Sequence, residues 1–162
     1  IMLAAQQAAE NATGKNVAVI PSTTLPQGIA AMFEYSNFTA DNLLTEVEDA
    51  MTAILKTVRT CEITTATRSV DLDGVSVTQG DWIGLLDDVL VAAGKEIPPL
   101  AVELLEKAGA DNYERITLYY GDQSDEAQAT ALMTTLQNRF SEQDFEVVSG
   151  GQALYPYIIS VE

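Results

Sequence analysis

The sequence predicts an α/β protein, mixed α+β in type, with two lobes. We expect an incomplete parallel α/β unit over residues 1–60, followed over residues 61–162 by a strand-rich, mixed-sheet lobe with a helix-strand-helix-strand-strand C-terminal portion. Three observations support this prediction. Apolar residues recur at three- and four-residue steps in several segments, the hydrophobic period changes near residue 60, and apolar residues form 47% of the 162-residue chain, enough for a sizeable core.

The first lobe begins with a helical pattern and a short apolar run. Residues 2–12 have the alanine-rich composition of a helix. Residues 17–20 (VAVI) form a continuous apolar run, which is typical of a buried parallel strand. The chain opens at Ile1 with no capping residue before its first helical residues, so we expect a piece of a longer protein, cut inside or just before a helix.

Two further helices are predicted before residue 60. Pro26 suits the first turn of a helix. The apolar face of this helix includes Ile29, Met32 and Phe33. Residues 37–57 predict a longer helix, entered through Thr39 or Asp41, because leucine, valine, methionine and isoleucine recur there at helical spacing.

The second lobe begins with residues that favour strands. Residues 61–94 are rich in threonine and valine, alternate repeatedly, and are interrupted by glycine-containing turns at residues 73–74 and 79–80. This pattern predicts several short antiparallel strands joined by tight turns.

The last third of the chain returns to mixed structure. Pro98 opens a helix, residues 115–120 form a strand, and Ser124 is expected as the N-cap of the next helix. Residues 145–148 and 157–161 are predicted as the last two strands.

Charge limits the partners that this chain can bind. Against 8 lysines and arginines stand 24 aspartates and glutamates, for a formal net charge of −16. Such a surface repels phosphate, so nucleic-acid binding and attachment to anionic membranes are both disfavoured. No apolar run approaches the length of a membrane span, so we expect no membrane insertion and a cytoplasmic setting. A basic protein partner would be attracted.

The chain also lacks the residues of several common active sites. It has no histidine, and its single cysteine, Cys61, cannot form an intramolecular disulfide. Serine-histidine and cysteine-histidine hydrolysis and a zinc cluster are therefore excluded within these residues. Neither a Walker A motif nor a G-x-G-x-x-G motif is present, so the sequence gives poor support to a nucleotide site, and we expect no cofactor or metal in this chain.

The loop PSTTLPQG is the first candidate site. It joins the predicted strand at residues 17–20 to the helix that contains Pro26, and ligands bind at such positions in open α/β sheets. Ser22, Thr23 and Thr24 add hydroxyl groups there. The alternative, which we favour, is that these residues only cap the helix.

Carboxylates are crowded in the strand-rich region, at Asp71, Asp73, Asp81, Asp87 and Asp88. Paired carboxylates bind magnesium or act in acid-base chemistry. Aspartate is also a preferred turn residue and protects exposed sheet edges against aggregation. We favour the turn interpretation.

Tyrosines near the end of the chain form the second candidate site. Tyr119 and Tyr120 end a predicted strand, and with Tyr155 and Tyr157 they form either an aromatic patch for a protein interface or internal packing between two strands. The connection GGQALYP, residues 150–156, combines two glycines with a proline. These residues explain a sharp turn, but they do not explain why a glutamine stands at position 152. The candidate partner- or ligand-binding residues are Ser22, Thr23, Thr24, Gln27, Tyr120, Asp122, Gly150, Gly151, Gln152, Tyr155 and Tyr157.

Five stretches together resemble a known family. LAAQQAAE, VAVIPSTTLPQGIAAM, ATRSVDLDGVSVTQGDWIGLLDD, LYYGD and GGQALYPYIISVE are similar, in order and spacing, to the C-terminal region of the ATP-binding component of bacterial fatty acid kinase, a dihydroxyacetone kinase-like or DAK-domain protein. The resemblance covers essentially the whole chain. It implies that ATP and magnesium bind to a separate N-terminal domain, and that further strands precede LAAQQAAE.

The resemblance also implies a function for the chain. In this family the C-terminal region engages a DegV-like fatty-acid-binding protein, and the kinase phosphorylates the acyl carboxylate to supply phospholipid synthesis. We therefore expect a non-catalytic docking domain that contacts the rest of the kinase chain. The alternatives are a domain that binds a small ligand such as lipid or phosphate at residues 22–24, and a structural domain that orients the kinase or forms a homodimer.

Overall fold

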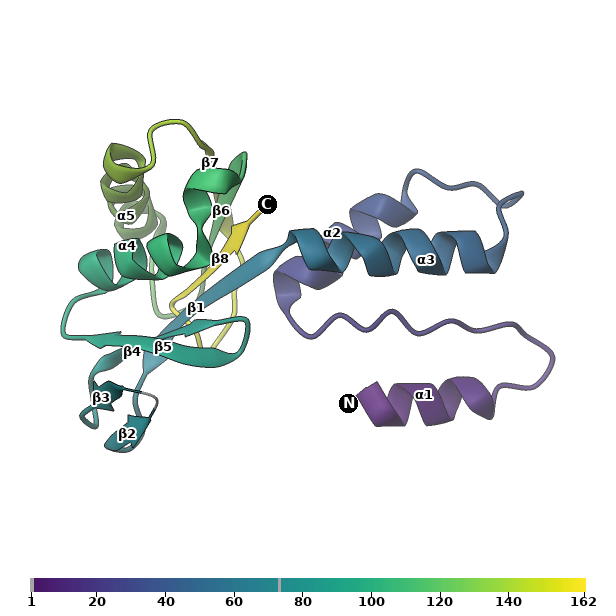
Figure 1. Ribbon diagram of the computed structural model, residues 1–162, viewed down its shortest axis with the longest axis horizontal. Helices are drawn as coiled ribbons and strands as arrows, with labels where there is room; N and C mark the ends of the chain where they lie inside the picture. The colour runs from purple at the N-terminus through teal and green to yellow at the C-terminus, as the bar shows by residue number, and fades with distance from the viewer. Residues whose placement is uncertain (1, 73) are drawn as a thin grey trace. The chain divides into compact units, whose positions relative to one another are not determined.

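The chain folds into two compact units, one ending at Val58 and the other beginning at Arg59. The computed structural model describes residues 2–72 and 74–162. The second unit combines helices with strands, and its main sheet contains both parallel and antiparallel pairs (Figure 1). The predicted α/β class, mixed α+β in type, is confirmed.

The first unit is built from helices. They are α1 (Met2–Glu10), α2 (Leu25–Tyr35), α3 (Leu44–Ile54) and the short 3₁₀ helix η1 (Leu55–Thr57). A small core forms where α2 meets α3, because Ala31 packs with Met51 and Leu55 and these three side chains are buried. Burial of such apolar surface is what holds short helices together. The helices predicted at residues 2–12 and after Pro26 are confirmed.

The apolar run at residues 17–20 does not form the predicted strand. The segment runs between α1 and α2 without regular structure (Figure 1). Its last residue, Ile20, packs against the small core of α2 and α3. A strand exists only beside a hydrogen-bonded neighbour, and no strand forms within residues 2–58 that would pair with this segment.

The helix predicted over residues 37–57 is shorter than expected. Before it, Asn42 Oδ1 accepts hydrogen bonds from the Thr39 amide at 2.9 Å and from the Thr39 hydroxyl at 3.2 Å, which fixes a turn. The helix α3 then starts after Leu43, whose amide donates to Glu46 Oε2 at 3.2 Å. Entry through Thr39 or Asp41 was therefore wrong, because the asparagine side chain stabilises a turn there instead.

The described residues of the second unit form eight strands. They are β1 (Arg59–Thr65), β2 (Val70–Leu72), β3 (Val75–Val77), β4 (Trp82–Leu86), β5 (Val89–Gly94), β6 (Arg115–Tyr120), β7 (Asp144–Ser149) and β8 (Tyr157–Val161). The pairs β1–β4, β2–β3 and β4–β5 are antiparallel, which confirms the short antiparallel strands predicted for residues 61–94.

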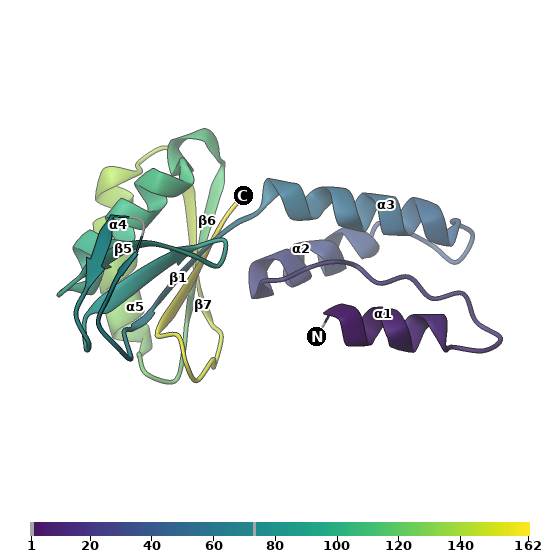
Figure 2. The same cartoon turned by 60° about the horizontal axis from the view of Figure 1, so that its bottom comes forward.

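Six strands form one sheet in the order β5-β4-β1-β8-β6-β7, while β2 and β3 pair separately (Figure 1; Figure 2 shows the same sheet from another side). The last strand in the chain, β8, lies between β1 and β6 and pairs antiparallel with both. Among the described strand pairs, only β6 and β7 run parallel, and they are connected through a helix, as a parallel pair requires. The central place of β8 therefore joins the antiparallel and parallel halves of the sheet.

Helices α4 (Ile97–Ala108) and α5 (Glu126–Arg139) pack on one face of this sheet, with the short 3₁₀ helix η2 (Ala110–Asn112) between them in sequence. The main core lies at this contact and includes Cys61, Ile63, Leu100, Leu104, Ile116, Leu118, Leu136, Phe140, Tyr157, Ile159 and Val161. The predicted helix-strand-helix-strand-strand order of the last third is confirmed.

One predicted cap is displaced by a residue. Asp125, and not Ser124, is the N-cap of α5, and its Oδ1 accepts a hydrogen bond from the Gln128 amide at 2.8 Å. Gln128 Oε1 accepts in return from the Asp125 amide at 3.1 Å, which completes a capping box. A carboxylate here also interacts favourably with the positive end of the helix dipole, which a serine hydroxyl does less well.

Candidate functional site

The loop before α2 is held by its own side chains. Thr24 is the N-cap and its Oγ1 accepts from the Gln27 amide at 3.4 Å. Gln27 Oε1 accepts from the amide and the hydroxyl of Thr23, at 3.0 and 3.2 Å, and its Nε2 donates to the Leu55 carbonyl at 3.3 Å. Ser22 is half-buried, and its amide donates to the Ile20 carbonyl. The structure thus brings Thr23, Thr24 and Gln27 together as a cap that fastens α2 to the end of α3.

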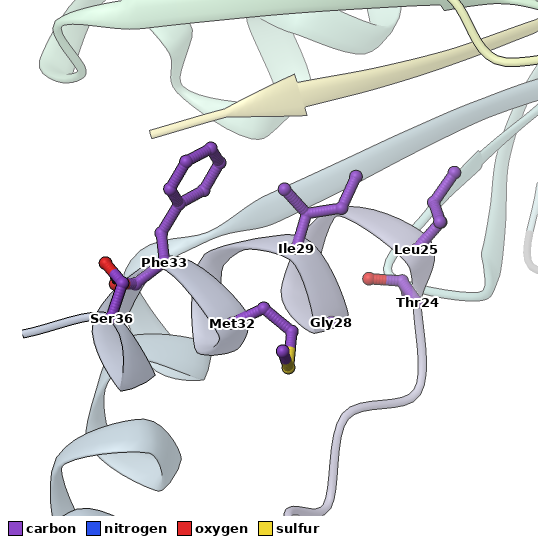
Figure 3. A pocket seen from close by; sticks show the side chains of 7 residues that line it. All are labelled: Thr24, Leu25, Gly28, Ile29, Met32, Phe33 and Ser36. Atoms are coloured by element: carbon purple, nitrogen blue, oxygen red, sulfur yellow. Dashed lines mark hydrogen bonds between the residues drawn. The ribbon is translucent and has the colours of Figure 1, made fainter. Parts of the chain in front are cut away.

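An apolar hollow of about 720 Å³ opens along α2 (Figure 3). Leu25, Ile29 and Phe33 project to the same side of the helix, one turn apart, while Met32 leaves in another direction (Figure 3). Leu25 is 46% exposed, Met32 62% and Phe33 72%. We call Leu25, Ile29 and Phe33 the α2 face. Exposed apolar patches of this kind mark sites of protein or lipid contact.

The sequence pattern did not predict that the α2 face is exposed. Ile29, Met32 and Phe33 have the spacing of an amphipathic helix, which is normally the spacing of a core-facing stripe. The pattern alone does not distinguish an apolar stripe that is covered from one that is left open. Leu25, just ahead of Pro26, lay outside the predicted stripe, although it belongs to the same side of the helix.

The GGQALYP loop, residues 150–156, closes over the end of β6. The Gly121 amide donates to the Pro156 carbonyl and the Asp122 amide to the Gln152 carbonyl, both at 3.0 Å. A Cβ added at Gly121 would lie 2.2 Å from the Gln152 carbonyl oxygen and 2.5 Å from that of Tyr155. Only glycine permits so close an approach of two backbones.

Gln152 has a structural role in this loop. Its Nε2 donates to the Tyr119 carbonyl at 3.0 Å, on the strand that the loop covers. The amides of Gly150 and Gly151 both donate to the Tyr120 carbonyl, at 2.9 and 3.3 Å. Gly151 has a φ of 65°, in the left-handed region that favours glycine. These bonds explain why two glycines and a glutamine occupy positions 150–152. They also bring Tyr120, Asp122 and residues 150–152 into one cluster.

The tyrosines divide between the core and the surface. Tyr157 is 3% exposed and lies opposite Tyr120 in the β6–β8 pair, where both pack against the main core. Tyr155 is half-buried in the loop. Burial raises the pKa of the Tyr155 hydroxyl, and the carboxylates of Glu62 and Asp88 raise it further. Internal packing therefore accounts for Tyr120 and Tyr157, and a role of any tyrosine in partner contact stays a prediction.

The carboxylates of the strand-rich region make local contacts. Asp87 Oδ2 accepts from Arg59 Nε at 2.6 Å and its Oδ1 from the Thr60 amide at 2.9 Å. Asp87 and Asp88 have positive φ, as tight turns require. Asp73, which we predicted in a turn, lies outside the described residues. Across residues 2–72 and 74–162, no group of three or more aspartate, glutamate or cysteine side chains is arranged to hold a metal ion.

Asp81 should make the stability of the second unit depend on pH. Its carboxylate accepts from Lys95 Nζ, and from the Thr78 amide at 3.0 Å, and these bonds hold the pKa of Asp81 below its ordinary value of 3.8. Because the folded pKa is the lower one, the stabilisation is fully present above the ordinary pKa and is lost as the pH falls through the folded value.

We expect Asp81→Asn to lower stability at neutral pH and to have a smaller effect in acid. Urea unfolding at several pH values between about 3 and 7 measures this dependence. Asp71→Asn, which removes the same charge from an exposed position in the β2–β3 hairpin, is the control. An equal effect of Asp81→Asn at all pH values would contradict the prediction.

Cys61 has no reactive character in this fold. It is fully buried in the main core, and burial raises the pKa of its thiol to about 12. A thiol with so high a pKa is a poor nucleophile at neutral pH. The residue acts as a small apolar side chain of the core.

Comparison with known proteins identifies the family of this chain. A family model for the C-terminal region of FakA-like fatty acid kinase proteins matches residues 1–162. The chain belongs to this family. An uncharacterized protein of Staphylococcus aureus strain MRSA252 is 31% identical over 162 residues, and one of strain USA300 is 30% identical. Both matches cover the whole chain but only 29% of the relative, so this C-terminal domain spans less than a third of their length.

Solved structures show which fold this FakA-like C-terminal domain shares. A DegV family protein from Corynebacterium glutamicum matches with a TM-score of 0.64 and 18% identity, over 99% of this chain and 69% of that one. A DegV family protein from Ruminococcus gnavus, whose structure holds vaccenic acid, matches with a TM-score of 0.56 and 11% identity, over 98% of this chain and 64% of that one. The domain therefore has a DegV-like fold. Within the described residues, no helix is long and apolar enough to span a membrane.

Proposed function

We propose that this chain is the docking domain of a fatty acid kinase. It would bind a DegV-like fatty-acid-binding protein so that a separate ATP-binding domain phosphorylates the acyl carboxylate. The observation that carries this proposal is the α2 face, an exposed apolar surface on an otherwise strongly acidic chain. Membership of the FakA-like fatty acid kinase family supports the proposed phosphorylation of an acyl carboxylate.

The other components of the reaction are placed outside this chain. In this proposal ATP and magnesium bind to the N-terminal part of the kinase, the acyl phosphate supplies phospholipid synthesis, and the assembly works in the cytoplasm. The length of the curated relatives, more than three times that of the matched region, leaves room for such a catalytic part. The net charge of −16 favours a carrier with a basic docking surface.

The proposal predicts that the α2 face contributes to carrier binding. We expect Phe33→Ser in the full-length kinase to weaken binding of a fatty-acid-loaded DegV-like protein by about tenfold or more, because an aromatic side chain at an interface is a frequent hot spot. Titration calorimetry measures the affinity. Folding should be little affected, since Phe33 is 72% exposed.

Leu3→Ser is the matched control for this experiment. Leu3 is also a large apolar side chain of the first unit, 75% exposed, but it lies on α1. Equal affinities of wild type, Phe33→Ser and Leu3→Ser would exclude the α2 face from docking. A wild-type kinase that does not bind the loaded carrier would contradict the proposed function itself.

A second candidate is that the α2 face binds a lipid directly. The hollow is lined almost wholly by apolar groups, with the Thr24 and Ser36 hydroxyls at its two ends. Mass spectrometry of the purified kinase would detect a co-purified fatty acid, and its loss in Phe33→Ser would favour this candidate over docking. A change of oligomeric state in Phe33→Ser would instead indicate a homodimer formed through this face.

A further inference from the structure

The strand β7 is one outer edge of the six-stranded sheet. Within the described residues it pairs only with β6. At the start of this pair the Asp144 amide donates to the Glu114 carbonyl at 2.8 Å, and just past its end the Gly150 amide donates to the Tyr120 carbonyl at 2.9 Å. The register is regular between these two bonds. The even-numbered residues of β7 are therefore the ones whose backbone groups bond to β6.

The odd-numbered residues of β7 direct their backbone groups away from the sheet, because these groups alternate in direction along a strand. They are Phe145, Val147 and Ser149. Ser149 is exposed, while the side chains of Phe145 and Val147 pack half-buried against the main core. We call the outward N–H and C=O groups of these three residues the β7 edge. Such a row of groups is a template to which another strand can be added.

The opposite edge of the sheet is protected. There β3 packs against β5, Lys107 Nζ donates to the Val91 carbonyl, and the β4–β5 register is irregular between Gly84 and Leu85. Cover, lysine and irregular pairing are devices that block the addition of a strand. Residues 144–149 (DFEVVS) contain no lysine, proline or glycine, and their pairing with β6 keeps one register. The β7 edge therefore lacks these protections.

The side chains beside the β7 edge are acidic. Asp144 and Glu146 are exposed and lie two residues apart, so they share one face of the strand. Burial raises the pKa of Tyr119 on the neighbouring strand β6, and the carboxylates of Glu162 and Glu146 raise it further, which places both carboxylates near one another. Arg115 is close by, but among the described ion pairs none includes Arg115, Asp144 or Glu146.

We propose that the β7 edge binds an extended, basic segment of the docked carrier protein as an added strand. This inference rests on the proposed function and gives the second unit a contact region of its own. The segment would form backbone hydrogen bonds with Phe145, Val147 and Ser149. Lysine or arginine side chains at alternate positions of the segment would lie beside Asp144 and Glu146.

Charge favours a basic segment over a second copy of this chain. Pairing of two β7 strands would bring two sets of Asp144 and Glu146 carboxylates close together, on chains that each carry a formal net charge of −16. Like charges on neighbouring strands are destabilising. The same carboxylates attract a cationic strand, so they select the partner as well as repel the wrong one.

The first test measures residue-resolved hydrogen exchange in the full-length kinase, with and without the fatty-acid-loaded DegV-like protein. We expect exchange at the amides of Phe145, Val147 and Ser149 to slow by about tenfold or more in the complex. The amides of Asp144, Glu146 and Val148 should change little, because β6 already protects them. Protection at every second residue is specific to an added strand, since contact through side chains alone does not produce it.

The second test is Ser149→Pro in the same kinase, with Ser149→Ala as the matched control. Proline removes the outward amide without removing a bond to β6, and it is tolerated on an edge strand when its nitrogen faces solvent. We expect Ser149→Pro to weaken carrier binding by about tenfold and Ser149→Ala to bind like wild type. Urea unfolding should show similar stability for the two variants.

A third comparison tests the charge and does not depend on tolerance of the proline. Glu146→Gln and Asp71→Asn each remove one exposed carboxylate, but Asp71 lies on β2. We expect Glu146→Gln to weaken carrier binding by about threefold or more and to reduce its salt dependence, while Asp71→Asn stays close to wild type.

The outcomes separate this inference from the proposed function. Alternate protection along β7, together with weaker binding by Ser149→Pro and Glu146→Gln than by their controls, supports the inference. Unchanged exchange at the three outward amides overturns it and leaves the docking function intact. A change of oligomeric state in Ser149→Pro would assign the β7 edge to a second copy and also overturn it. If the wild-type kinase does not bind the loaded carrier, the proposed function fails and this inference fails with it.

Discussion

Replacing Gly121 by alanine should lower the free energy of unfolding of the second unit by about 2–3 kcal/mol. The added methyl group would lie 2.2 Å from the Gln152 carbonyl oxygen and 2.5 Å from the Tyr155 carbonyl oxygen. Both are backbone atoms, so no side chain can rotate to make room. The GGQALYP loop must move away from the end of β6, and the hydrogen bonds of the Gly121 and Asp122 amides to that loop are lost with it.

Two measurements check this expectation. Urea unfolding gives the change in stability, and hydrogen exchange should become faster at the Asp122 amide, which donates to the Gln152 carbonyl. Gly94→Ala is the control, because a methyl group at Gly94 has no neighbour closer than 3.8 Å. If Gly121→Ala were as stable as Gly94→Ala, the close approach of loop and strand would be contradicted.

Leu104→Ala should destabilise the second unit by about 3 kcal/mol. Leu104 is fully buried on α4 and packs directly over Gly84 of β4, where an added Cβ would lie 2.7–2.8 Å from three of its side-chain carbons. Removing the leucine therefore leaves a cavity between helix and sheet. The lost contacts and the unfilled volume both reduce stability.

The same contact predicts that two substitutions compensate. Gly84→Ala alone should destabilise, because its methyl group overlaps Leu104, but in the Leu104→Ala background it enters the space that the leucine left. The double variant should then be more stable than the sum of the single effects predicts. Strict additivity in a double-mutant cycle of urea unfolding would show that Leu104 does not pack on Gly84.

Local patterns were sufficient to predict most of the second unit. The alternation in residues 61–94 and the turn residues between its runs predict antiparallel strands, because strand and turn chemistry depend on near neighbours in sequence. The α4 and α5 helices were predicted for the same reason. The cap of α5 was misplaced by one residue, since Ser124 and Asp125 are both good caps and the Asp125–Gln128 capping box decides between them.

Contacts between distant residues were beyond local patterns. Residues 17–20 have the composition of a strand, yet pairing depends on a neighbour that the composition does not reveal. The role of Gln152 depends on its bond to the Tyr119 carbonyl, 33 residues away in the sequence, which no local pattern indicates. The exposure of the α2 face depends on what lies across from it in space. The surface that carries our proposed function is therefore hard to recognise in the sequence.

The central position of β8 affects how the second unit is made on the ribosome. The strands β1 and β6, its neighbours in the sheet, are synthesised long before Tyr157–Val161. Until β8 emerges, the edges of β1 and β6 that it will occupy have no partner, and unpaired strand edges of a nascent chain are prone to aggregation. Deletion of Tyr157–Val161 would thus remove one short strand but leave two incomplete half-sheets, which we expect cellular proteases to remove.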